Sequence, residues 1–133
     1  MEEFDWYDYA VGGAASRPDS FSRLNPDYAR AVSELLLAAD EELGPRSLLI
    51  TSAYRSPELQ AQLYADEVAK TGSPEAARRM VAPPGYSRHN YGLAVDFADA
   101  TGALLRDPNS REAQWLAENA SRFGLGVPMS WEP

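Results

Sequence analysis

Apolar residues between positions 28 and 43 recur every three or four positions, which is the spacing of one face of an α-helix. Asn25 is a plausible N-cap for this helix, Pro26 suits its first turn, and Gly44-Pro45 closes it. We expect the acidic residues on the opposite face to be solvated. They are Glu34, Asp40, Glu41 and Glu42.

Three further helices are predicted by the same kind of local signal. Ser56-Pro57 and Ser73-Pro74 each place a capping serine before a proline, and a last helix begins near Asn109 or Ser110. Gly72 is expected to end the first of these helices. Its residues expected to face inward are Leu59, Leu63 and Val68.

Two short apolar runs are typical of β-strands. Residues 48–51 form one run, and residues 92–97 form another, in which alternate side chains share a face. We expect residues 103–105 to form a hairpin with the second run. Helices and strands in this order predict an α+β fold, with a small, mainly antiparallel sheet flanked by helices.

The first 24 residues form a segment without periodicity, because Gly12-Gly13, Pro18 and small polar residues interrupt it. Its aromatic residues favour a segment that folds over the core. We therefore expect an N-terminal arm, residues 1–24, followed by a main domain, residues 25–133. The aromatic residues of the arm are Trp6, Tyr7, Tyr9 and Phe21.

Composition and charge exclude several classes of partner. The 12 basic and 20 acidic residues give a net charge of −8, which argues against nucleic acid and against docking on an anionic membrane. The chain has no cysteine, so it forms no disulfide and no thiolate metal site. No membrane span and no secretory signal are expected. If the protein acts outside the cytoplasm, something else must carry or release it.

The single histidine and a strand aspartate are the best candidates for metal ligands. His89 lies in a polar turn, and Asp96 lies between the apolar residues Val95 and Phe97. Burial of such a carboxylate is costly unless a cation meets it, and a divalent metal shared with His89 would be that cation. The alternative is a surface histidine with a separately satisfied aspartate, and the isolated pair favours this alternative.

Two other charged residues are candidates for catalysis. Arg55 follows a buried strand, where its guanidinium could bind a carboxylate or stabilise an oxyanion, or could form a structural ion pair. Glu132 could serve as a general base beside a metal, or could be a solvated terminal residue. A serine hydrolase built on Ser87 and His89 is disfavoured, because no nucleophile elbow surrounds Ser87.

Taken together, these segments resemble the M15 family of zinc D,D-peptidases, which includes phage L-alanyl-D-glutamate endolysins. The family motif Ser-x-His-x-x-Gly-x-Ala-x-Asp is complete here. Its residues are Ser87, His89, Gly92, Ala94 and Asp96. The upstream family segment matches Ser52-Ala53-Tyr54-Arg55-Ser56, with Gln60 shortly after it.

The resemblance implies a role for each matched residue. His89 and Asp96 would bind Zn²⁺, and Ser87 would contact the substrate. Arg55 would stabilise the developing oxyanion, and Gln60 would support the site. The resemblance also identifies Glu132 as the general base of a peptidase that cleaves peptidoglycan stem peptides.

The family continues after this glutamate with a Trp-His pair whose histidine is the third zinc ligand, whereas the present sequence ends at Pro133. Three explanations remain open: a longer product, a ligand from a partner chain, or lost catalysis. We favour the first. The alternative function is a non-catalytic wall-binding or structural module of a phage-like particle. The resemblance to phage-type members further suggests action on the wall after release or on a virion.

Overall fold

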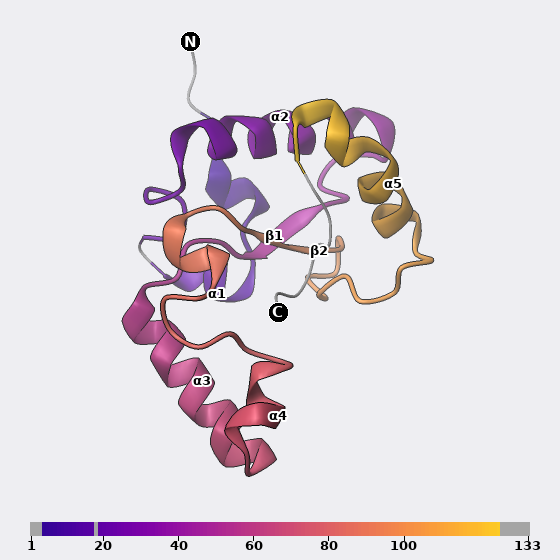
Figure 1. Cartoon of the computed structure of the whole chain (residues 1–133). Coiled ribbons are helices and arrows are strands. Elements are labelled where there is room, and N and C mark those ends of the chain that lie inside the picture. The colour runs from indigo at the N-terminus through magenta and orange to yellow at the C-terminus, as the bar shows by residue number, and fades with distance from the viewer. Residues whose placement is uncertain (1–3, 18, 126–133) are drawn as a thin grey trace.

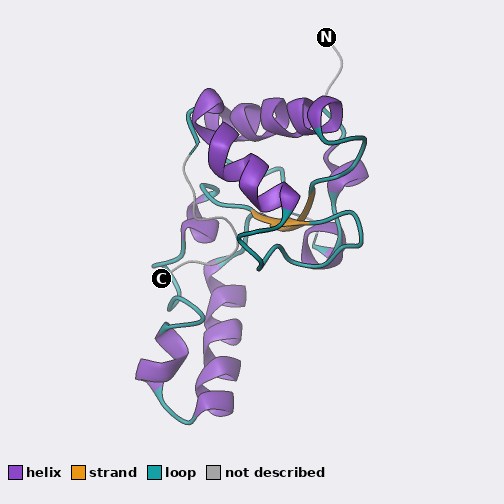
Figure 2. Ribbon diagram, turned by 90° about the vertical axis from the view of Figure 1, so that its right-hand side faces the viewer, coloured by secondary structure: helices purple, strands orange, loops and turns teal. Residues whose placement is uncertain are grey.

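The computed structural model of the chain describes residues 4–17 and 19–125. Helices α2 and α5 lie on one side of the β1–β2 pair, and α3 and α4 extend away from it on the other (Figures 1 and 2). The predicted α+β class is confirmed. In chain order the elements are η1 (Trp6–Tyr9), α1 (Gly12–Ser16), α2 (Pro26–Glu42), β1 (Leu49–Ser52), α3 (Pro57–Thr71), α4 (Pro74–Arg78), η2 (Arg88–Tyr91), β2 (Asp96–Ala98), α5 (Arg111–Asn119) and η3 (Ala120–Phe123).

Strands β1 and β2 pair in antiparallel fashion, and this pairing fixes the position of Asp96. Leu49 lies opposite Ala98, and Ser52 lies opposite Asp96, with an irregularity of register between them. The predicted hairpin is also present, because Leu104 forms an antiparallel bridge with Ala98. Residues directly opposite each other point to the same face of a sheet, so Ser52 and Asp96 share one face.

The second strand is shorter than the sequence predicts. We expected residues 92–97, but β2 begins only at Asp96, and the side chain of Leu93 is 45% exposed. The backbone of Gly92 is instead engaged with the start of α2, where its carbonyl accepts a hydrogen bond from Asn25 N at 3.0 Å. This tertiary contact overrides the alternating pattern of residues 92–95.

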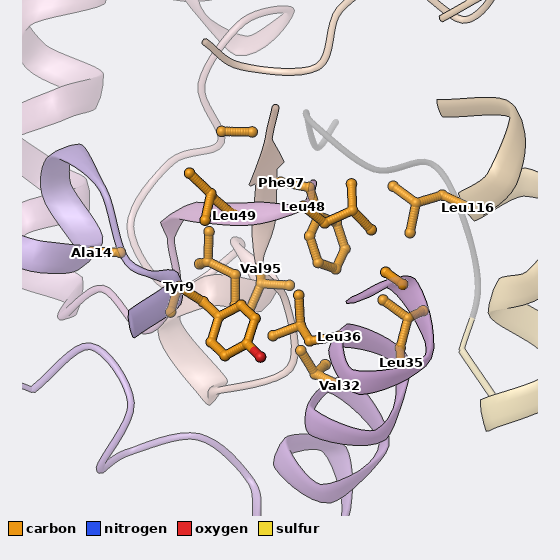
Figure 3. Packing of buried hydrophobic residues seen from close by; sticks show 14 of the residues in the cluster. Tyr9, Ala14, Val32, Leu35, Leu36, Leu48, Leu49, Val95, Phe97 and Leu116 are labelled. Atoms are coloured by element: carbon orange, nitrogen blue, oxygen red, sulfur yellow. The ribbon is translucent and has the colours of Figure 1, made fainter. Parts of the chain in front are cut away.

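The core lies between α2, α5 and the two strands. Figure 3 shows Val32, Leu35 and Leu36 of α2 on the side that faces the strand residues, with Leu116 of α5 beside them. The N-terminal segment also contributes buried residues to this cluster. They are Tyr9, Ala14, Phe21 and Leu24.

Side-chain caps are present at the starts of the four predicted helices, α2, α3, α4 and α5. The Asn25 side chain accepts hydrogen bonds from Asp27 N and Tyr28 N. Serine caps begin the other three helices in the same way, each accepting from a backbone N–H in the first turn. These serines are Ser56, Ser73 and Ser110.

Part of the acidic face of α2 is not simply solvated, contrary to expectation. The Asp40 carboxylate accepts hydrogen bonds from Tyr9 Oη and from Arg46. The Glu42 carboxylate accepts one from Trp115 Nε1 at 3.1 Å and another from Arg122. Tyr9, Trp115 and Arg122 are distant in sequence from the carboxylates they contact, so the charge pattern of the helix alone could not reveal them.

Helix α3 leaves the body of the protein and packs along α4 (Figure 2). Leu59, Leu63 and Val68, which we expected to face inward, are half-buried. Gln60 is the buried residue of this helix. Within the described ranges, no helix has both the length and the apolar character needed to cross a bilayer.

Candidate metal and substrate site

The structure brings the side chains of His89 and Asp96 together. His89 lies in η2, where its side chain is almost completely buried, and Asp96 opens β2 with a side chain that is 17% exposed. His89 Nε2 and Asp96 Oδ2 are 3.4 Å apart. The sequence predicts that these two side chains converge, and they do so because η2 and the start of β2 lie next to each other.

The orientation of the imidazole follows from its other nitrogen. His89 Nδ1 lies 2.6 Å from the carbonyl oxygen of Ala53. A carbonyl oxygen can only accept a hydrogen bond, so Nδ1 carries the proton. In the neutral ring, Nε2 therefore presents its lone pair toward the Asp96 carboxylate. An N–H donated to a backbone carbonyl is how metal-binding histidines are usually held.

The donor atoms fit a zinc ion. Zinc binds histidine nitrogen and carboxylate oxygen at about 2.0–2.2 Å, usually in tetrahedral geometry. Two ligands at those distances lie about 3.4 Å from each other, and the separation of His89 Nε2 and Asp96 Oδ2 is 3.4 Å. In the described part of the chain, no group of three histidine, cysteine or acidic side chains gathers at one point. His89 and Asp96 therefore fit two of the ligand positions of a zinc site.

Gly92 allows the turn between the two side chains. Its φ is +70°, a left-handed conformation that favours glycine. A Cβ at this position would lie 2.3 Å from the carbonyl oxygen of Arg23 and 2.9 Å from Asn25 N. Both obstacles are backbone atoms and cannot swing aside. The glycine of the motif therefore lets η2 pack directly against the start of α2.

Ser87 and Asn90 fix the turn from its other side. Ser87 is buried, and its Oγ accepts a hydrogen bond from His89 N at 3.1 Å. Asn90 Nδ2 donates to the carbonyl of Arg55 at 2.8 Å, and Arg55 N donates to the carbonyl of His89 at 3.1 Å. The backbone of Arg55 is thus bound to η2, and its half-buried side chain begins next to His89.

Gln60 reaches the loop before the motif rather than the His89–Asp96 pair. It is fully buried, and its Nε2 donates a 2.6 Å hydrogen bond to the carbonyl of Ala82. Its Oε1 is buried without a hydrogen-bond partner among the described residues. Glu132, the expected base, lies outside the described residues.

Two residues near the site were missed by sequence reasoning. The hydroxyl of Tyr28 in α2 lies against the backbone of Val95, and burial together with the nearby Asp96 charge raises its pKa to about 12. Arg17 in the N-terminal segment is half-buried, and burial and the charge of Arg55 lower its pKa. No local pattern reveals the position of Tyr28, because its contact with Val95 depends on tertiary packing.

Comparison with known proteins identifies the family. The profile of the VanY family, described as D-alanyl-D-alanine carboxypeptidases, matches residues 21–132. The chain belongs to this family. A D-alanyl-D-alanine carboxypeptidase from Enterococcus faecium is 30% identical over 107 residues, which are 80% of this chain and 31% of that protein. The predicted family resemblance is thereby confirmed.

Solved structures agree with this assignment and with the fold. The LdcB LD-carboxypeptidase superposes with a TM-score of 0.69 at 26% identity, covering 86% of this chain and 53% of that one. The vancomycin-resistance D,D-pentapeptidase VanY, solved with Zn(II), gives a TM-score of 0.60 at 28% identity, covering 76% and 58%. The chain spans about a third of the length of the curated relatives it matches.

Proposed function

We propose that the chain is a zinc-dependent carboxypeptidase that acts on peptidoglycan stem peptides. The observation that carries the proposal is the convergence of His89 Nε2 and Asp96 Oδ2 at 3.4 Å. Membership of the VanY family supports it. The likeness to the D,D-pentapeptidase VanY solved with Zn(II) supports it too, as does the likeness to VanYB solved in complex with D-alanine-D-alanine.

His89 and Asp96 would hold the zinc ion in this proposal. The bond from His89 Nδ1 to Ala53 fixes the tautomer that leaves Nε2 available as a ligand. When bound, zinc supplies Lewis-acid chemistry, withdrawing electrons from a scissile carbonyl and making water a stronger nucleophile. Catalytic zinc usually takes three protein ligands, so the proposal requires another besides this pair.

Other residues of the chain would bind the peptide and move the proton. The backbone of Arg55 is fixed to η2, and the guanidinium of this residue would neutralise the charge that develops on the scissile carbonyl. Ser87 would contact the substrate, and Gln60 would hold the loop at Ala82 in place. Glu132 would take the proton from the attacking water and pass it to the leaving amine, an assignment that rests on the family resemblance.

The test is release of D-alanine from defined stem peptides. The full chain, supplied with one equivalent of zinc, is incubated with a stem tetrapeptide and with the pentapeptide ending in D-alanyl-D-alanine, and products are measured by mass spectrometry. We expect cleavage of at least one peptide. Asp96→Asn should lower the rate by about a hundredfold or more, because it weakens a metal ligand.

Asp66→Asn is the matched control, because Asp66 lies exposed on α3 and accepts a hydrogen bond from Gln62 Nε2. It should leave the rate unchanged. If the zinc-loaded chain releases no fragment from either peptide, the enzymatic proposal fails. Binding of the peptides without cleavage would instead support the non-catalytic wall-binding module. The endolysin role and the phage-like particle remain predictions from the resemblance.

A further inference from the structure

Ser52 is a buried serine at the end of β1 whose hydroxyl group has no hydrogen-bond partner. The residue is 7% exposed, and its Oγ bonds to nothing among the described residues. The other buried serines in the described ranges each use Oγ in a hydrogen bond. They are Ser20, Ser47 and Ser87. A buried hydroxyl group without a partner is costly, so such a group in a folded protein calls for an explanation.

An irregularity in β1 places this hydroxyl group opposite the candidate metal ligand. Ile50 lies opposite Phe97, but the next pair is Ser52 and Asp96, so Thr51 is an extra residue in this strand. In an unbroken register Thr51 would lie opposite Asp96 instead. Bulges of this kind are common beside active sites, where they change the direction of a side chain. Here the irregularity presents Ser52 to Asp96.

The Asp96 carboxylate can serve as the acceptor for this hydroxyl group. Opposite residues of an antiparallel pair have Cβ atoms about 4.5–5.5 Å apart, so rotation of the two side chains can bring Ser52 Oγ within hydrogen-bond distance. Asp96 Oδ2 faces His89 Nε2 at 3.4 Å, on the side where an ion would be held. Its other oxygen, Oδ1, remains an acceptor when Oδ2 binds a metal. Carboxylates that bind metals are usually hydrogen-bonded in this way.

We propose that Ser52 is a positioning residue of the metal site, whose hydroxyl group donates a hydrogen bond to Asp96 Oδ1 while Oδ2 binds the ion. The proposal rests on the zinc site proposed above and makes its architecture more specific. The bond holds the carboxylate in one orientation, so less side-chain freedom is lost when the ion binds. It also gives the buried hydroxyl group its missing partner. Ser52 therefore stabilises the metal-bound form of the protein rather than the metal-free fold.

The test measures zinc affinity, which does not depend on catalysis. Zinc is titrated into the full chain in competition with a chromophoric chelator, and His89→Ala shows how much of the binding belongs to this site. Ser52→Ala should lower the affinity about tenfold to a hundredfold, which is the usual effect of removing a hydrogen-bond partner from a metal ligand. Ser52→Thr keeps a hydroxyl group on the same carbon atom and should restore most of the affinity.

Ser47→Ala is the matched control, because Ser47 is a buried serine just before β1 whose hydroxyl group already donates to the carbonyl of Gly44. It should leave zinc affinity unchanged and lower the urea midpoint of the metal-free chain. Ser52→Ala should leave that midpoint unchanged or raise it, because it removes a buried hydroxyl group that has no partner. These opposite responses separate positioning of the metal ligand from a general loss of structure.

Each result bears on Ser52 and on the peptidase function separately. Wild-type zinc affinity in Ser52→Ala overturns the role of Ser52 and leaves the peptidase function standing. A Ser52→Thr chain that has the wild-type urea midpoint but binds zinc as weakly as Ser52→Ala also overturns this role. If zinc binding responds as expected but stem peptides are not cleaved, the inference is supported and only the catalytic function is rejected. A wild-type chain that binds zinc no better than His89→Ala overturns both proposals.

Discussion

Replacing Gly92 by alanine should destabilise the protein more than the same change at any open glycine. The left-handed backbone at this position, with φ of +70°, costs an alanine about 1–2 kcal/mol. The new methyl group would also lie 2.3 Å from the carbonyl oxygen of Arg23, and such overpacking costs a further ~1–3 kcal/mol. The expected loss is therefore about 2–5 kcal/mol, out of a typical total of about 5–15 kcal/mol.

Gly72→Ala is the matched control, because Gly72 and Gly92 each follow a helix and each have a left-handed backbone conformation. Gly72 has φ of +79° and nothing within 4 Å of an added Cβ. It should lose only the conformational part, about 1–2 kcal/mol. The free energies of unfolding are measured by urea denaturation of both variants. If Gly92→Ala loses no more than Gly72→Ala, the contact between η2 and the start of α2 is not as close as described.

Two further predictions concern stability and the support of the site. Burial raises the pKa of Tyr9 and of Tyr28 from 10.0 to about 12, so their contribution is fully present below pH 10 and is lost as the pH rises through 12. Urea denaturation should show that the free energy of unfolding falls between pH 10 and pH 12, and Tyr28→Phe should make this fall smaller. If the fall is the same in Tyr28→Phe as in the wild-type chain, the raised pKa of Tyr28 is refuted. Asn90→Ala removes the bonds to Arg55 O and from Gly85 N and should cost about 1–3 kcal/mol, whereas a loss below ~0.5 kcal/mol would contradict their importance.

The sequence predicts most of the helices because their signals are local. Asn25-Pro26 and Ser56-Pro57 each supply a cap and a suitable first residue within two positions, and both helices begin there. Gly72 likewise ends α3 in the left-handed conformation. Such signals do not depend on the rest of the fold, so they can be recognised without it.

The parts that were mispredicted depend on contacts between distant segments. The second strand was extended too far because nothing near Leu93 indicates that Gly92 packs on the start of α2. Leu59 and its apolar neighbours on α3 are only half-buried, because α3 packs on α4, and helical spacing cannot tell whether a helix packs on the body or projects from it. Tertiary structure decides both cases.

The candidate site was partly predictable for the same reason. The motif predicted that His89 and Asp96 converge, and their side chains do lie together. Their role as zinc ligands stays a prediction. Burial lowers the pKa of Arg17, and this burial depends on how the N-terminal segment packs, which the sequence alone does not show.

The most direct test of the central claim is diffraction from zinc-soaked crystals of the chain, recorded on both sides of the zinc absorption edge. We predict one strong anomalous peak about 2.0–2.2 Å from both His89 Nε2 and an Asp96 carboxylate oxygen, with the imidazole still bonded through Nδ1 to Ala53. A map without a peak between these two side chains, or with zinc bound only elsewhere, would contradict the account.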